Sequence, residues 1–225
     1  MDNHPMNHAM KCPPRPFLAQ HSPAAQRNGP VILQVLQEIL PRSGLALEVA
    51  SGTGQHVALF AAGLPQWTWQ PSDAQTDAFA SIVQWCQQAD VTNVREPLVI
   101  NVLSPHWPSG ADEFRTRFDA IFCANMLHIS PWSTCAALMQ GAYRYLAPLG
   151  VLITYGPYLE PNVLTSEGNL DFDKNLRERN PAWGIRLLDD VLAQAELAGL
   201  QLHERREMPA NNLLLEFRLA APRQP

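Results

Sequence analysis

The sequence predicts an α/β fold of a single domain, with a doubly wound, mostly parallel sheet of seven strands that ends in a C-terminal antiparallel hairpin. Three observations carry this prediction. An apolar run at residues 45–50 leads into a loop of small residues. Apolar runs then alternate with helical patterns, as in folds whose helices cover both faces of a parallel sheet. Two final strand-like runs have a link so short that they must be antiparallel neighbours.

The first helix is expected at 29–40, because Pro30 suits a first turn and Pro41 ends the apolar stripe. The strand at 45–50 is apolar on nearly every residue, as expected for a strand covered on both faces. A helix at 55–62 follows the small-residue loop. The next units are a strand at 67–71, a helix at 74–88 that packs its apolar residues inward, and a third strand at 97–102.

The second half of the chain continues this alternation. A loop marked by Pro105, Pro108 and Gly110 separates the third strand from the next apolar run. Strands are expected at 118–124 and 151–155, with helices at 131–146 and 189–198. The closing hairpin pairs 200–205 with 213–219 through the turn-forming Pro209-Ala210-Asn211-Asn212. We therefore expect a flexible tail at 1–16, one domain at 17–220 and a short tail at 221–225.

Composition excludes several classes of protein. The 225 residues suffice for one substantial core, and the net charge of -5 with only two lysines argues against a nucleic-acid surface. The four cysteines have no metal-ligand or redox spacing, so we expect no bound metal and a reduced, cytoplasmic setting. No stretch is apolar enough for a membrane span. We expect a protein that acts on a small molecule, as a monomer or homodimer.

The loop after the first strand has the composition of a cofactor site. The strand ends in Glu48-Val49-Ala50, and the loop reads Ser51-Gly52-Thr53-Gly54 before a helix begins. Backbone N–H groups of such a loop and the helix N-terminus face one crevice. A phosphate cradle would have Lys or more Gly here. The acid instead favours a cationic ligand, and S-adenosylmethionine carries positive charge on its ammonium and its sulfonium.

The chain resembles the class I S-adenosylmethionine-dependent methyltransferases over residues 17–220, and among them the methyltransferase-like protein 26 family. The matching motifs lie in order along the chain: Ser22-Pro23-Ala24-Ala25-Gln26-Arg27-Asn28, Ala50-Ser51-Gly52-Thr53-Gly54-Gln55-His56, Asn125-Met126-Leu127-His128-Ile129, Tyr155-Gly156-Pro157-Tyr158, Ser166-Glu167-Gly168-Asn169 with Phe172-Asp173, and Asn180-Pro181-Ala182-Trp183-Gly184-Ile185-Arg186. The resemblance implies a Rossmann-like methyltransferase fold and S-adenosylmethionine as cofactor. It does not supply the methyl acceptor.

The resemblance also implies roles for individual residues. Glu48 and Ser51, Gly52, Thr53 and Gly54 should surround the methionine part of the cofactor, and Asp73 should accept hydrogen bonds from both ribose hydroxyls. Asn101 and Val102 should meet the adenine, and Asn125 and Met126 should lie beside the sulfonium. Asn101 is a departure, since many relatives have an acid there, and its alternative role is to cap a turn. Ala50 replaces a common glycine, and its methyl group should fit if φ is negative.

Methyl transfer requires alignment of a nucleophile and, for a hydroxyl or amine, removal of a proton. His128 is the best candidate base because its unperturbed pKa lies near neutral, and its alternative role is to shape the pocket. Tyr155 is a second catalytic candidate, although core packing explains it almost as well. The segment 160–188 lies where relatives place substrate-recognition or lid insertions. Candidate substrate-binding residues there and nearby are Tyr158, Glu167, Asn169, Trp183 and Arg186.

Arg27 and Asn28 are predicted to bind the cofactor. The Arg27 guanidinium could clamp a carboxylate in a two-pronged hydrogen bond. That carboxylate belongs either to the methionine end of the cofactor or to a small acidic substrate, and a surface salt bridge is the alternative. If the clamp exists, residues 17–28 fold over the crevice.

Three functions are compatible with these residues. The first is a methyltransferase acting on an oxygen or nitrogen nucleophile of a small metabolite. The second is an S-adenosylmethionine-binding protein without transferase activity, such as a sensor or partner subunit. The third is a nicotinamide-dependent oxidoreductase, which ranks last because Val57 occupies the place of the third glycine in that fingerprint.

Overall fold

The computed structural model describes residues 19–221, so the predictions for the tail at 1–16 lie outside the described residues. One seven-stranded sheet organises the chain, with strand order β3-β2-β1-β4-β5-β9-β8. The strands are β1 (Gly44–Val49), β2 (Trp67–Asp73), β3 (Leu98–Val99), β4 (Phe118–Ala124), β5 (Leu146–Gly156), β8 (Leu200–Met208) and β9 (Asn212–Leu219). Strands β1 to β5 pair in parallel, and β9 is antiparallel to both of its neighbours. The predicted fold class is confirmed.

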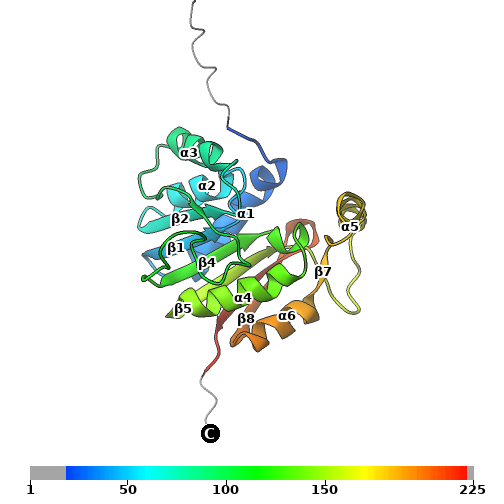
Figure 1. Ribbon diagram of the computed structural model, residues 1–225. Helices are drawn as coiled ribbons and strands as arrows, with labels where there is room; N and C mark the ends of the chain where they lie inside the picture. The colour runs from blue at the N-terminus through cyan, green and yellow to red at the C-terminus, as the bar shows by residue number, and fades with distance from the viewer. Residues whose placement is uncertain (1–18, 222–225) are drawn as a thin grey trace, which may run out of the picture.

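Helices cover both faces of this sheet (Figure 1). On one face lie α1 (Pro23–Ile39), α2 (Gln55–Gly63) and α3 (Phe79–Gln88), and on the other lie α4 (Ser133–Tyr145) and α6 (Leu188–Leu197). Each face has its own apolar core, because the strands bury side chains on both sides. Figure 1 shows α5 (Glu167–Arg179) standing apart from these layers. Short elements complete the chain: η1 (Met126–His128), β6 (Tyr158–Leu159), β7 (Arg186–Leu187) and η2 (Pro209–Asn211).

Helix α1 begins six residues earlier than the sequence pattern predicts. Ser22 caps it, since its Oγ accepts a hydrogen bond from the Ala25 N–H at 3.2 Å, and Pro23 occupies the first turn. Pro30 therefore lies inside the helix. The cap and the first proline, rather than the apolar stripe, determine where this helix starts.

Other boundaries also differ. The third strand shrinks to Leu98–Val99, at the edge of the sheet. Helix α3 begins at Phe79 instead of residue 74. Strand β5 begins at Leu146 instead of residue 151, because Leu146 pairs with Phe118 before an irregularity in the register. The carboxyl end of the third strand lies three residues earlier than expected, whereas those of β4 and β5 lie within one residue of the expected positions. Ligands bind at these carboxyl ends in open parallel sheets.

The sheet reverses its strand order between β1 and β4. β1 pairs with β2 on one side and with β4 on the other, so the loops that leave β1 and β4 diverge. Such a switch point opens a crevice at the carboxyl edge of the sheet. The small-residue loop and Asn125 both lie there. Within residues 19–221 no helix combines the length and the apolar character that crossing a bilayer requires.

Candidate active site

The loop between β1 and α2 turns sharply through left-handed backbone conformations. Ala50, Gly52 and Gly54 have φ values of 58°, 53° and 88°. Two hydrogen bonds fix the turn: the Ser51 N–H donates to the Ser72 carbonyl at 2.8 Å, and the Gly54 N–H donates to the Ser51 carbonyl at 3.1 Å. An ideal Cβ at Gly52 would meet no heavy atom within 4 Å, so this face of the loop is open. The expected glycine loop is therefore present and accessible.

The negative φ under which the Ala50 methyl group was expected to fit is not found. Its φ of 58° lies in the left-handed region, which costs an ordinary L-residue roughly 1–2 kcal/mol. The methyl group is accommodated in space, because Ala50 packs against the core, but the backbone is strained.

Replacing Ala50 with glycine should raise the free energy of unfolding by about 1 kcal/mol, because relief of left-handed strain exceeds the entropy that glycine adds to the unfolded chain. Urea denaturation of the wild type and variant measures this change. Ala89→Gly is the control, since Ala89 has an ordinary φ of -82° and should gain nothing. An A50G variant less stable than the wild type would contradict the assignment of strain.

Asp73 at the end of β2 reaches the glycine loop. Its Oδ2 accepts a hydrogen bond from the Gly52 N–H at 3.0 Å, and its Oδ1 accepts a longer one from the Gln75 N–H at 3.4 Å. The carboxylate remains partly exposed. The structure thus brings together the two features that the sequence placed on successive strands.

Glu48, two residues before the loop, is buried, with 2% of its surface exposed. Its Oε2 has no hydrogen-bond partner among the described residues. Burial raises the pKa of this carboxyl to about 8, opposed by a hydrogen bond with Ser51 and supported by the nearby charge of Asp73. A buried carboxyl oxygen without a hydrogen-bond partner is costly, and a cationic ligand would supply that partner.

Asn101 forms the turn that the alternative interpretation describes. Its Oδ1 accepts a hydrogen bond from the Leu103 N–H at 3.0 Å, while its own N–H donates to Ser109 Oγ at 2.9 Å. The amide oxygen keeps a second lone pair, so turn capping leaves one position for a ligand. Val102 is buried beside it. Both residues stay candidates for the adenine end of a cofactor.

The N-terminal segment is attached to the helices that follow the glycine loop and β2. The Gln20 N–H donates to Ser81 Oγ at 2.8 Å, and the Trp85 indole N–H donates to the Gln20 carbonyl at 2.8 Å. The Ser22 N–H donates to Gln55 Oε1. Residues 20–22 therefore lie against the start of α2 and against α3.

A cavity of about 720 Å³ lies next to the crevice. The start of α1, the ends of β4 and β5, the start of α5 and the β8–β9 turn all contribute to its wall. Arg27, Asn28, Asn125 and Tyr155 line it, whereas Glu48, the glycine loop and Asp73 do not. This volume is typical of small-molecule sites. The carboxyl edge of the sheet therefore offers two neighbouring places, a crevice with two carboxyl groups and a cavity with one arginine.

Comparison with known proteins agrees with this arrangement. The family model described as "Protein of unknown function (DUF938)" matches residues 19–219. The chain belongs to the DUF938 family. This assignment gives the family of the chain and leaves its chemistry open.

Solved methyltransferase structures share the fold of this DUF938 protein. An O-methyltransferase family protein from Burkholderia thailandensis has a TM-score of 0.73 at 18% identity, over 88% of this chain and 58% of that chain. Mitomycin 7-O-methyltransferase has a TM-score of 0.72 at 13% identity, over 88% and 55%. Human N-acetylserotonin methyltransferase, solved in complex with S-adenosylmethionine, has a TM-score of 0.68 at 14% identity, over 88% and 53%. The DUF938 chain spans just over half the length of these proteins, and the likeness shows the fold.

A hydrogen bond that the sequence did not reveal lies at the cavity wall. His56 Nε2 lies 2.7 Å from Asn28 Oδ1, and Asn28 lines the cavity together with Tyr155. Burial lowers the pKa of His56 to about 4, so its ring is neutral and donates to Asn28. The ring is stacked on Phe60 at 5.4 Å. His56 therefore positions Asn28 at the cavity wall.

The structure does not support His128 as a general base. The side chain is fully buried, and neither ring nitrogen has a hydrogen-bond partner within the described residues. Burial and nearby Arg186 lower its pKa to about 3, so it accepts a proton poorly at neutral pH. A Cβ at Gly156 would lie 2.5 Å from its Nε2, so Gly156 permits this close packing. His128 is a core residue behind the cavity wall.

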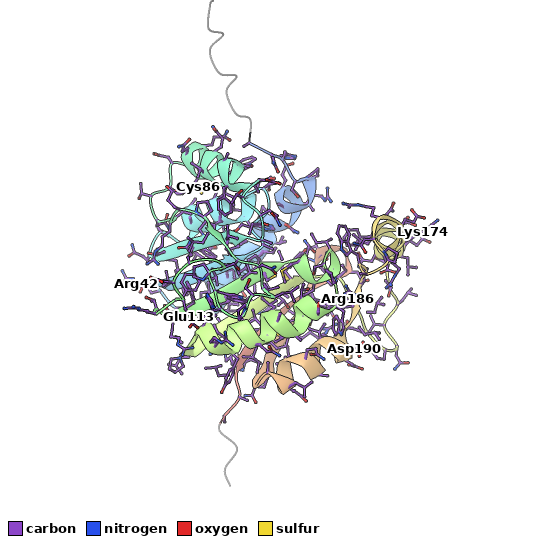
Figure 2. The ribbon with its side chains drawn as sticks, in the orientation of Figure 1. Arg42, Cys86, Glu113, Lys174, Arg186 and Asp190 are labelled. Carbon is purple, nitrogen blue, oxygen red and sulfur yellow. The ribbon has the colours of Figure 1, made fainter. Side chains whose placement is uncertain are left out.

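Tyr158 and Arg186 are also structural, contrary to their predicted roles in substrate binding. The buried Tyr158 hydroxyl donates to Thr154 Oγ1 at 2.9 Å, and its ring packs edge-on against His128. The Arg186 guanidinium donates to the carbonyls of Leu127, Ser130 and Ala182 at 2.7–2.9 Å. Figure 2 shows Arg186 beside α4 and Lys174 on the outer side of α5. These hydrogen bonds connect the segment after α5 to the loop after β4.

Some of the remaining substrate-binding candidates from 160–188 line the cavity and others do not. Asn169 lines the cavity, while its Nδ2 donates to the Asn211 carbonyl at 2.9 Å. Glu167 is exposed and does not line it. Trp183 also lies outside the lining, with the Arg179 guanidinium 5.2 Å from its ring centroid, so the predicted lid over the cavity is not formed by Trp183. Phe172 and Ser166 do line it, although the sequence argument gave them no role.

Proposed function

We propose that this protein is an S-adenosylmethionine-dependent methyltransferase that acts on an oxygen or nitrogen atom of a small metabolite. The observation that carries the proposal is the buried Glu48 carboxyl group, whose Oε2 has no hydrogen-bond partner among the described residues, beside an open glycine loop that hydrogen-bonds Asp73. The methyltransferase folds of the solved structures support it. The motifs quoted above further support a relationship to the methyltransferase-like protein 26 family.

The residues of the crevice fit the chemical groups of this cofactor. The ionised Glu48 carboxylate would accept a hydrogen bond from the ammonium group. This bond would supply the partner that Glu48 Oε2 lacks. Asp73 would accept from both ribose hydroxyls, and Asn101 and Val102 would flank the adenine. Asn125 and Met126, at the end of β4, would lie beside the sulfur. S-Adenosylmethionine supplies a methyl group activated by the positive sulfur atom.

The cavity would hold the acceptor. Burial raises the pKa of Tyr155, so its hydroxyl is protonated and can donate a hydrogen bond to the acceptor atom. When bound, the cofactor would supply the methyl group and its sulfur would keep the electron pair of the broken carbon–sulfur bond, while the cavity residues would hold the acceptor's nucleophilic atom in line. No Asp, Glu or His lines the cavity within residues 19–221, so the acceptor's proton passes to water or is lost before binding. Alignment and exclusion of solvent would then provide most of the catalysis.

Thermal denaturation of the full chain tests the cofactor. S-Adenosylhomocysteine at a hundredfold excess over its dissociation constant should raise Tm by about 5–10 °C, because a ligand bound only to the native state stabilises it. Asp73→Ala should weaken this binding at least tenfold, about 1.4 kcal/mol. NADH should leave Tm unchanged. An unchanged Tm with S-adenosylhomocysteine, or a rise with NADH, would overturn the proposal.

A second assay separates an enzyme from a sensor. Tyr155 lines the cavity, which favours the enzyme. Incubation with S-adenosylmethionine and a metabolite extract should release S-adenosylhomocysteine. Binding without such release would favour a cofactor-binding protein that lacks transferase activity.

A further inference from the structure

The cavity wall carries a positive charge. Arg27 is the only charged residue in the lining within residues 19–221. Its side chain is exposed, and it makes no ion pair or hydrogen bond with another side chain in that part of the chain. The alternative of a surface salt bridge therefore has no partner residue in the described structure. A cation that faces a cavity without a counter-charge favours an anionic ligand.

Helix α1 adds positive potential at the same wall. Ser22 and Ala24, at its start, line the cavity, and its first turn contains no acidic residue. The helix has 17 residues, so its N-terminus carries a substantial partial positive charge. The crevice next to the cavity has the opposite character, because the Asp73 carboxylate lies there. Negative groups are therefore favoured in the cavity and positive groups in the crevice.

The rest of the lining describes the body of the ligand. Val31, Pro157, Phe172 and Pro209 provide apolar and aromatic surface, while Asn125 and Tyr155 provide hydrogen-bonding groups near the end of β4 and β5. An arginine with a planar fork binds a carboxylate in two parallel hydrogen bonds. An apolar molecule with one carboxylate would satisfy both parts of this wall.

We propose that the acceptor is a small carboxylic acid with an apolar body, anchored by a hydrogen-bonded ion pair between its carboxylate and Arg27. This inference rests on the proposed function, since it names the class of acceptor for the same site. The carboxylate is the anchor, and a separate hydroxyl or amine beside Tyr155 is methylated. Arg27 then acts as a specificity residue of the acceptor cavity rather than as a ligand of the cofactor.

Benzoate and benzamide are matched probes, because they share size and shape and differ in charge. We expect the full chain saturated with S-adenosylhomocysteine to bind benzoate at least tenfold more tightly than benzamide in an NMR titration. In Arg27→Gln this ratio should fall to near one, a loss of about 1.4 kcal/mol or more. Arg42→Gln, which changes an exposed arginine far from α5 in Figure 2, should keep the ratio.

The cofactor's own carboxylate is the other possible partner of Arg27, and calorimetry with S-adenosylhomocysteine distinguishes the two. The acceptor assignment predicts that R27Q binds S-adenosylhomocysteine within twofold of the wild type. A tenfold loss would assign Arg27 to the cofactor and overturn the inference. So would equal or undetectable binding of the two probes, or a preference for benzoate that survives in R27Q. If S-adenosylhomocysteine itself does not bind, the proposed function fails, and the probes titrated without it still report on the arginine site.

Discussion

Glu48→Gln should stabilise the ligand-free protein by about 3 kcal/mol at pH 7, because folding no longer requires a carboxylate to take up a proton. Glutamine matches the protonated carboxyl group in shape and polarity, so little else changes. Chemical denaturation at pH 7 measures the difference. Glu96→Gln is the control, since Glu96 is exposed and should leave stability unchanged.

The pH dependence of the wild type follows from the same group. The folded pKa of about 8 exceeds the ordinary glutamate value of 4.5, so between these pH values the native state binds more protons than the unfolded state. The contribution of Glu48 to stability therefore falls as pH rises from about 4.5 to about 8, and then levels. In E48Q this part of the pH dependence of the free energy of unfolding should disappear. Identical slopes in the wild type and E48Q would show that Glu48 does not carry the shift.

The affinity for the cofactor should rise with pH, whereas the contribution of Glu48 to stability falls. A cationic ammonium group stabilises the ionised carboxyl, so binding at pH 7 should release a proton, and affinity should rise with pH up to about 8. E48Q should bind S-adenosylmethionine at least tenfold more weakly, about 1.4 kcal/mol, while it is the more stable protein. Calorimetry in buffers of different ionisation enthalpy measures the proton release. A variant that gains stability and keeps full affinity would remove Glu48 from the cofactor site.

The sequence predicts the crevice better than the cavity because the crevice depends on local order. The apolar β1, the glycine loop after it and Asp73 at the end of β2 are close in sequence, and the parallel sheet brings successive strand ends to one edge. The antiparallel hairpin was also predictable, since a short link leaves two strands one arrangement. These features can be predicted without knowing which residues distant in sequence contact one another.

The roles of buried polar side chains required the structure. Arg186 binds the carbonyls of Leu127 and Ser130, more than fifty positions away, and the sequence contains no signal for this pairing. An exposed histidine has a pKa near neutral pH. Burial of His128 against Gly156 lowers this pKa to about 3, so His128 is a poor base. The same reasoning applies to His56, which lies in a motif yet acts on Asn28 through tertiary contact. Burial and distant partners decide these roles, and sequence spacing reports neither.

Gly54→Ala should be strongly destabilising and should prevent cofactor binding. Its φ is 88°, and an added Cβ would lie 2.5 Å from Ile82 Cα, which belongs to the backbone of α3. The combined cost of left-handed strain and overpacking is about 3 kcal/mol. Because backbone cannot rotate aside as a flexible side chain can, α3 must move away from the loop. Urea denaturation measures the lost stability, and calorimetry measures the lost affinity for S-adenosylhomocysteine.

Gly52→Ala is the matched control, two residues earlier in the same loop. Its φ of 53° is also left-handed, but an added Cβ meets nothing within 4 Å. It should lose only the strain of about 1 kcal/mol and remain folded. The difference between the two variants isolates the close approach of α3, since both carry the same substitution in the same loop. Equal losses of stability would show that the backbone conformation alone, and not the contact with Ile82, requires glycine at this turn.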